Sequence, residues 1–75
     1  MESLYATKLQ KHGFVLAEEE QQLWILSGES NSVSISKIED SFVGLYSDLT
    51  GEVNELTSDD FDEVLEWALD NVENN

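Results

Sequence analysis

The spacing of apolar residues along this chain changes from helical to strand-like and back to helical. Near the N-terminus the apolar residues share one face of a helix, whereas from Phe14 to about Leu56 they come in short pieces separated by turn-like groups. From Phe61 onward the apolar residues recur at i, i+3 and i+4, which is typical of a helix laid on a core. A helix, a set of strands and a second helix in this order predict an α+β fold.

The first helix is predicted from about Ser3 to His12. Leu4, Tyr5 and Leu9 share a face, and Gly13 can end the helix in a left-handed conformation. Two of the three lysines and the only histidine fall in or beside its last turn, where positive charge meets the negative end of the helix dipole. We therefore expect them to have a structural role.

Four strands are predicted, and a short fifth strand is expected at the edge. In the third, Val33 and Ile35 alternate with serines, so one side of this strand should face water. The second and fourth are apolar at nearly every position, and both of their faces need cover. Two flanking helices, one helix and a dimer partner, or a ligand groove could supply it. Short connections predict an antiparallel meander of segments 14–18, 22–27, 32–38, 42–47 and 53–56.

The C-terminal segment predicts an amphipathic helix with Thr57 or Ser58 as its N-cap. Its apolar stripe consists of Phe61, Val64, Leu65, Ala68, Leu69 and Val72. At about 100° per residue, the acidic residues gather roughly opposite that stripe, and they are Asp59, Asp62, Glu63, Glu66, Asp70 and Glu73. Trp67 lies on the border between the two stripes.

A chain of 75 residues with 40% apolar content predicts a single α+β domain over residues 1–75. A small antiparallel sheet of three to five strands should carry the N-terminal helix and the C-terminal amphipathic helix. The chain has no cysteine, so neither a disulfide nor a thiolate metal site is expected. It shows neither a signal-peptide pattern nor the roughly 20 apolar residues that span a bilayer, and we expect a soluble cytoplasmic protein.

Charge is distributed unevenly along the chain. Seventeen acidic residues against three lysines give a net charge of −14, and residues 39–75 hold twelve of the acids and no base. Such a surface repels nucleic acid and anionic membranes, so we expect no direct binding to either. The expected partner is instead a basic protein surface rich in Lys and Arg.

The acidic stripe of the last helix has two main explanations. It can be a solvated face that serves only solubility. Alternatively, it docks on a basic protein surface, as an inhibitor or a nucleic-acid mimic, because its carboxylates recur about every 4 Å along the axis, close to the 3.4 Å per charge of one DNA strand. Like charges spaced three and four residues apart destabilise a helix, and a partner would relieve that repulsion.

Metal binding and catalysis are weaker interpretations of the same carboxylates. The segment around Asp59 lacks the glycine of a calcium loop, so we expect no metal site and no cofactor. The chain has one histidine, no cysteine and no arginine, and its serines lack a nucleophile-elbow pattern. We therefore expect no enzyme.

The predicted function is thus a small acidic, non-catalytic protein-binding domain. Its site residues are Asp59, Asp62, Glu63, Glu66, Trp67 and Asp70. Trp67 is included because an aromatic ring beside carboxylates can meet an arginine of a partner. We expect five further acids to extend the field, namely Glu39, Asp40, Asp48, Glu52 and Glu55. The alternative is a small acidic domain that forms a homodimer through its sheet and whose acidity serves solubility only.

Overall fold

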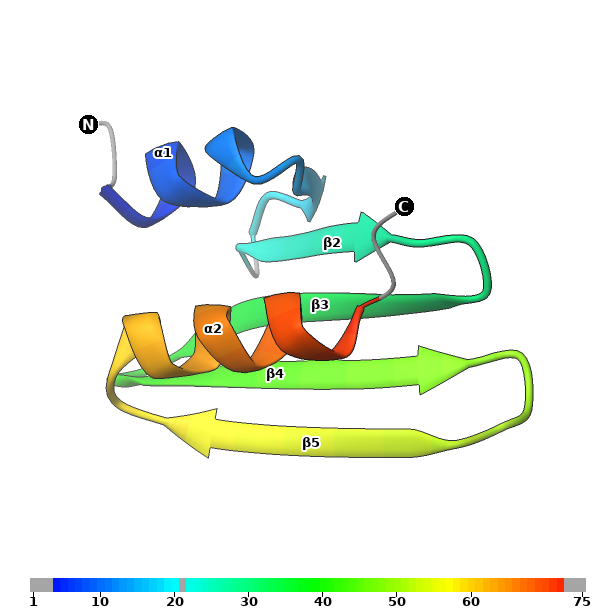
Figure 1. Cartoon of the computed structure of the whole chain (residues 1–75). Coiled ribbons are helices and arrows are strands. Elements are labelled where there is room, and N and C mark those ends of the chain that lie inside the picture. Colours follow the sequence, from blue (N-terminus) through cyan, green and yellow to red (C-terminus); the bar gives the residue numbers. More distant parts are fainter. Residues whose placement is uncertain (1–3, 21, 73–75) are drawn as a thin grey trace.

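The computed structural model describes residues 4–20 and 22–72, and it confirms the α+β fold. An N-terminal helix is followed by an antiparallel sheet and a C-terminal helix (Figure 1). The described residues form α1 (Leu4–Lys11), β1 (Val15–Glu18), β2 (Leu23–Ser27), β3 (Asn31–Ile38), β4 (Ser41–Asp48), β5 (Val53–Ser58) and α2 (Phe61–Asn71).

The sheet is a meander in which each strand pairs antiparallel with the next, in the order β1-β2-β3-β4-β5. Side chains alternate between the faces, so the register defines an inner and an outer face. One row across the inner face runs through Trp24, Ile35, Gly44 and Leu56. The neighbouring row across the outer face runs through Val15, Ile25, Ser34, Leu45 and Glu55.

Both described helices lie on the inner face. Their buried side chains form one cluster with those of the sheet, and this core consists of Leu9, Phe14, Trp24, Val33, Ile35, Phe42, Phe61, Val64, Leu65, Ala68 and Val72. The alternation predicted for β3 is confirmed, because Val33 and Ile35 are each only 1% exposed. The sequence left three ways to cover the two faces of the sheet, and one of them was a helix on each face. This arrangement is excluded for the described residues, because α1 and α2 lie on the same face. No described element covers the outer face.

The first helix ends as its sequence predicts. Gly13 adopts a φ of +96°, and the amide of Phe14 donates to the carbonyl of Leu9 at 2.9 Å. Lys8 and Lys11 both lie in the last turn. The reversal brings the chain directly into β1 and fixes α1 beside β2.

The second helix begins later than predicted. Its N-cap is Asp60, whose carboxylate accepts a hydrogen bond from the amide of Asp62 at 3.1 Å, so the expected caps Thr57 and Ser58 were wrong. Both of these residues belong to β5 instead, because pairing with β4 continues as far as Ser58. Among the described residues, neither helix is long and apolar enough to cross a membrane.

Candidate protein-binding site

Packing on the sheet determines which side of α2 faces water. Phe61, Val64, Leu65 and Ala68 are buried against the strands, and α2 lies mainly over β4 with further contacts to β3 and β5. Because a helix has 3.6 residues per turn, Asp62, Glu63 and Glu66 between these positions point away from the sheet, whereas Trp67 lies at the border of the buried side. The structure therefore presents the acidic residues of α2 outward.

We call this surface the acidic face and define it as Asp59, Asp62, Glu63, Glu66 and Asp70. All five residues are exposed. Four of them lie within α2, where Asp62 to Asp70 covers about 12 Å of helix axis with a carboxylate roughly every 4 Å. Asp59 precedes the helix, and Glu73 lies outside the described residues. The structure thus places four of the five carboxylates that the sequence assigned to the site on one exposed side of α2, and it leaves Asp59 exposed just before the helix.

One carboxylate of the acidic face is paired with α1. The ammonium of Lys8 lies 3.0 Å from Oδ1 of Asp62, and this contact was not predicted, because the two residues are 54 positions apart in the sequence. Their side chains are 50% and 70% exposed, so the pair contributes at most about 1 kcal/mol. For the other four carboxylates, no ion pair appears among the described residues.

Glu63 has a local structural role. The hydroxyl of Ser58 donates to its carboxylate at 2.7 Å, and the same oxygen of Ser58 accepts from the amide of Asp60 at 3.1 Å. These bonds fix the connection between β5 and α2. Within the acidic face, Asp59, Glu66 and Asp70 remain the carboxylates to which the structure gives neither an ion pair nor a side-chain hydrogen bond among the described residues.

Trp67 is half-buried, and its ring lies on the sheet. A Cβ atom added to Gly44 would meet Cζ3 of Trp67 at 2.8 Å and Cγ1 of Val64 at 3.0 Å. The absence of a side chain on Gly44 therefore allows the indole to approach β4 closely. Trp67 thus contributes to packing, while its contact with a partner's arginine stays a prediction for the exposed part of the ring.

The five further acids do not share one surface. Glu55 is the cross-strand partner of Leu45, so it projects from the outer face of the sheet and does not extend the acidic face. Glu39 and Asp40 form the turn between β3 and β4, and both are exposed. Glu52 is exposed in the turn between β4 and β5. The field of these residues is therefore spread around the sheet.

Asp48, the fifth of these acids, organises the turn after β4. Its Oδ1 accepts from the hydroxyl of Thr50 at 2.6 Å and from the amides of Thr50 and Glu52, and its Oδ2 accepts from the hydroxyl of Tyr46 at 3.1 Å. The hydrogen bond from the Thr50 hydroxyl and the further donors outweigh desolvation and lower the pKa of Asp48. Asp48 is therefore a structural carboxylate.

The neighbouring tyrosine is affected in the opposite direction. The amide of Asn31, 3.5 Å away, acts to lower the pKa of Tyr46, but desolvation and the charge of Asp48 outweigh it and raise that pKa. The phenol therefore stays protonated and continues to donate to Asp48. This cluster of three residues ties the ends of β3 and β4 together.

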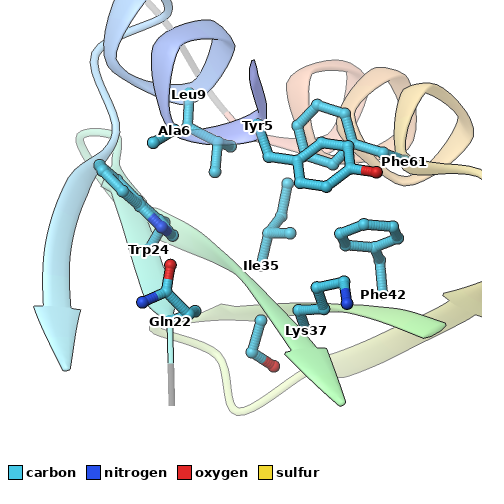
Figure 2. Close-up of a pocket in the computed structure, with 10 residues that line it drawn as sticks. Tyr5, Ala6, Leu9, Gln22, Trp24, Ile35, Lys37, Phe42 and Phe61 are labelled. Carbon is cyan, nitrogen blue, oxygen red and sulfur yellow. The ribbon is translucent and has the colours of Figure 1, made fainter. Parts of the chain in front are cut away.

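A small cavity opens between α1 and the sheet. It has a volume of about 60 Å³, and Tyr5, Trp24, Phe42 and Phe61 supply its aromatic wall. Figure 2 shows these rings with Gln22 and Lys37 beside them. The rings of Tyr5 and Phe61 lie 4.8 Å apart and those of Tyr5 and Phe42 lie 4.9 Å apart. Sequence reasoning missed this cavity because its wall comes from separate elements.

Comparison with models of protein families, with curated proteins and with solved structures finds no match to this chain. Within residues 4–20 and 22–72, no three His, Cys, Asp or Glu side chains lie together as a metal site would require. The residues of the acidic face therefore have to be interpreted from their own geometry.

Proposed function

We propose that this chain is a small protein-binding domain that docks through the acidic face on a basic protein surface. The observation that supports the proposal is that Asp62, Glu63, Glu66 and Asp70 are exposed on the side of α2 away from its buried residues, with Asp59 exposed just before the helix. A partner rich in Lys and Arg would meet several carboxylates at once, and each contact would be a charge-assisted hydrogen bond. The partner is thus a protein, and not a nucleic acid or a membrane.

The energetics of α2 support this proposal. Glu66 and Asp70 are four residues apart, and like charges at this spacing destabilise a helix by about 0.2–0.5 kcal/mol. Asp70 also lies in the last turn, where negative charge is unfavourable and where α2 carries no basic residue. A cationic partner would remove both effects on binding, so the repulsion in the free protein becomes a source of affinity in the complex.

The spacing of the carboxylates indicates how such a partner would be occupied. A repeat of about 4 Å along α2 is close to the spacing of phosphates along one DNA strand. A protein that binds nucleic acid through a row of cations would accept this helix in the same channel. We therefore propose inhibition by nucleic-acid mimicry as the form that docking takes.

Capture from a lysate of the source organism tests the proposal when two matched variants are compared. The first variant, Asp62→Asn, Glu66→Gln and Asp70→Asn, neutralises the acidic face. The second, Glu18→Gln, Glu19→Gln and Glu20→Gln, removes the same number of charges from the exposed end of β1 and the turn that follows it. We expect a basic protein to be captured at low salt by the natural chain and by the second variant but not by the first.

Duplex DNA should displace the captured protein from this chain, since the DNA and the acidic face would occupy the same channel of that protein. The proposal fails if nothing basic is captured, if all three chains capture the same protein equally, or if both variants lose it to the same extent. In the last case only the net charge would matter, and the acidity would serve solubility.

A further inference from the structure

The outer face of the sheet is the largest part of the fold that the acidic face leaves unexplained. Three of its aliphatic side chains are exposed, with Val15 at 67%, Val53 at 62% and Leu45 at 42%. Leu23, Ile25 and Val43 on the same face are half-buried. No described element covers them, because α1 and α2 both lie on the inner face. An aliphatic sheet surface of this kind is typical of a face that packs against another layer.

We propose that the outer face is a two-fold interface between two copies of this chain. Charge is the first reason. In a chain with 20 charged residues, Glu18 and Glu55 are the only charged residues that the described strands place on this face, and both lie on edge strands. Depletion of charge with retention of aliphatic residues marks the core of an interface.

The pattern of side chains on the outer face is self-complementary. Two aliphatic ridges lie on either side of β3, one formed by Val15, Leu23 and Ile25 and the other by Val43, Leu45 and Val53. Between them, β3 presents Ser32, Ser34 and Ser36. A two-fold axis along β3 exchanges β2 with β4 and β1 with β5. It places Ile25 of one copy against Leu45 of the other and Leu23 against Val43, with the small serines facing each other at the centre and Val15 opposite Glu55 at the rim. Such an interface is isologous, as a closed dimer requires.

The available area is sufficient for a dimer. Five strands about 4.8 Å apart, with an average length of about 20 Å, offer roughly 500 Å² per copy, or about 1,000 Å² for the pair. This value reaches the threshold of about 1,000 Å² for a biological interface and lies in the range of weak, reversible association.

The edges of the sheet are poorly suited to the same purpose. β1 has only four residues, and its pairing with β2 shifts register between Leu16 and Glu18. At the other edge, β5 carries Glu55 and follows Glu52 directly. Short strands, bulges and charges prevent edge-to-edge pairing, so a second copy would approach the face.

Charge repulsion does not exclude this arrangement. In a face-to-face dimer the two acidic faces point away from each other, separated by two sheets about 10 Å apart and by the helix layers, which makes roughly 30 Å in all. This distance is more than three times the Debye length of about 8 Å at physiological salt. At 0.01 M salt the Debye length is about 30 Å, so the repulsion is felt there, and raising the salt from low to physiological concentration should strengthen the dimer. This response is opposite to the one expected for docking through the acidic face.

Sedimentation equilibrium over a series of protein concentrations tests the interface. We expect the mass to approach twice the monomer value of 8.5 kDa and the dimer to be strengthened by salt. Leu45→Lys should restore the monomer, because it puts an ammonium group into both symmetry-related contacts between the aliphatic ridges. It does so even though the substitution lowers the net negative charge of the chain. Glu55 lies directly across from it and can pair with the new lysine, which preserves the sheet.

Gln10→Lys is the matched control, since it makes the same change of charge on the exposed surface of α1 and should leave the dimer intact. A second measurement does not depend on the folding of the Leu45 variant. Ser34→Cys should give a disulfide-linked dimer on oxidation, whereas Gln10→Cys should not, and the natural chain has no cysteine to interfere. A monomer at every concentration and salt, a dimer that survives Leu45→Lys, or equal cross-linking of both cysteine variants would overturn the interface.

Discussion

At Gly44, the sheet and α2 approach each other more closely than a strand side chain would allow. The nearest atoms to an added Cβ belong to Trp67 and Val64, at 2.8 and 3.0 Å, and both side chains are held by the core. Contact at this distance cannot be relieved by rotation of a flexible chain end. Gly44 therefore sets the height of α2, and with it the position of the acidic face.

Gly44→Ala should lower the free energy of unfolding by about 1–3 kcal/mol, because overpacking displaces the indole and the helix. Urea denaturation measures the change, and quenching of Trp67 fluorescence should increase as the ring is pushed outward. Gly51→Ala is a useful comparison, since nothing lies within 4 Å of that residue and only its φ of +93° is strained. If Gly44→Ala left both stability and quenching unchanged, the close packing described here would be wrong.

Asp48 makes the stability of the fold depend on pH, and this contribution can be separated from that of the other acidic residues. Its pKa is lowered in the folded state, so ionised Asp48 stabilises the protein above its ordinary pKa of 3.8, and this stabilisation is lost as the pH falls through the folded value. We expect Asp48→Asn to lower Tm at neutral pH. The difference from the natural chain should then shrink as the pH falls below about 4, and it should be smallest once the pH is below the lowered pKa at which the native carboxyl group becomes protonated.

Thermal unfolding followed by circular dichroism across this pH range provides the measurement. Glu29→Gln serves as a control because Glu29 is an exposed carboxylate in the β2–β3 connection. A difference between Asp48→Asn and the natural chain that stayed constant with pH would show that the hydrogen bonds of Asp48 do not depend on its charge.

Among the elements, α2 has a capped N-terminus with favourable charges and a C-terminus with an unfavourable charge. Asp60 caps the helix, and Asp62 and Glu63 lie in the first turn, where the dipole favours them. Asp70 lies at the other end without a basic neighbour in the last turn. The buried apolar residues of α2 hold the helix on the sheet, and the surface charges do not. The protein can therefore tolerate the repulsion among the carboxylates of the acidic face.

Asp70→Lys should therefore stabilise the protein while it weakens docking. The new lysine follows Glu66 by four residues and lies at the favourable end of the dipole, and together these effects should raise the free energy of unfolding by about 1 kcal/mol at low salt. Urea denaturation at low and high salt would show the gain and its reduction by screening. Asp70→Asn should give a smaller gain, and an unchanged or lower stability for Asp70→Lys would contradict the repulsion assumed for the natural helix.

The elements themselves were predictable from local patterns. The alternation of Val33 and Ile35 with serines predicted one wet side of β3, and the spacing from Phe61 to Val72 predicted which side of α2 is buried. The N-cap was not predictable in the same way, since the extent of β5 depends on its pairing with β4. Likewise, the ion pair between Lys8 and Asp62 and the contact between Trp67 and Gly44 join distant segments, and no local pattern indicates such contacts.

At the scale of the whole molecule, the sheet separates two kinds of surface. Both helices and the acidic face lie on one side, and the aliphatic outer face lies on the other. From the sequence, apolar residues on both sides of β2 and β4 predicted that both faces need cover, but the choice of cover depends on how the helices are distributed in space. The same arrangement predicts opposite responses to salt, since docking should weaken and self-association should strengthen.

The central claim is that the acidic face, and not the net charge, binds a basic partner. Titration of the captured protein with the natural chain and with both triple variants, at several salt concentrations, tests it most directly. We expect the affinity of the natural chain and of the Glu18, Glu19 and Glu20 variant to fall steeply with salt, and that of the Asp62, Glu66 and Asp70 variant to be low and nearly independent of salt. Equal affinities and equal salt dependence for the two variants would contradict the claim.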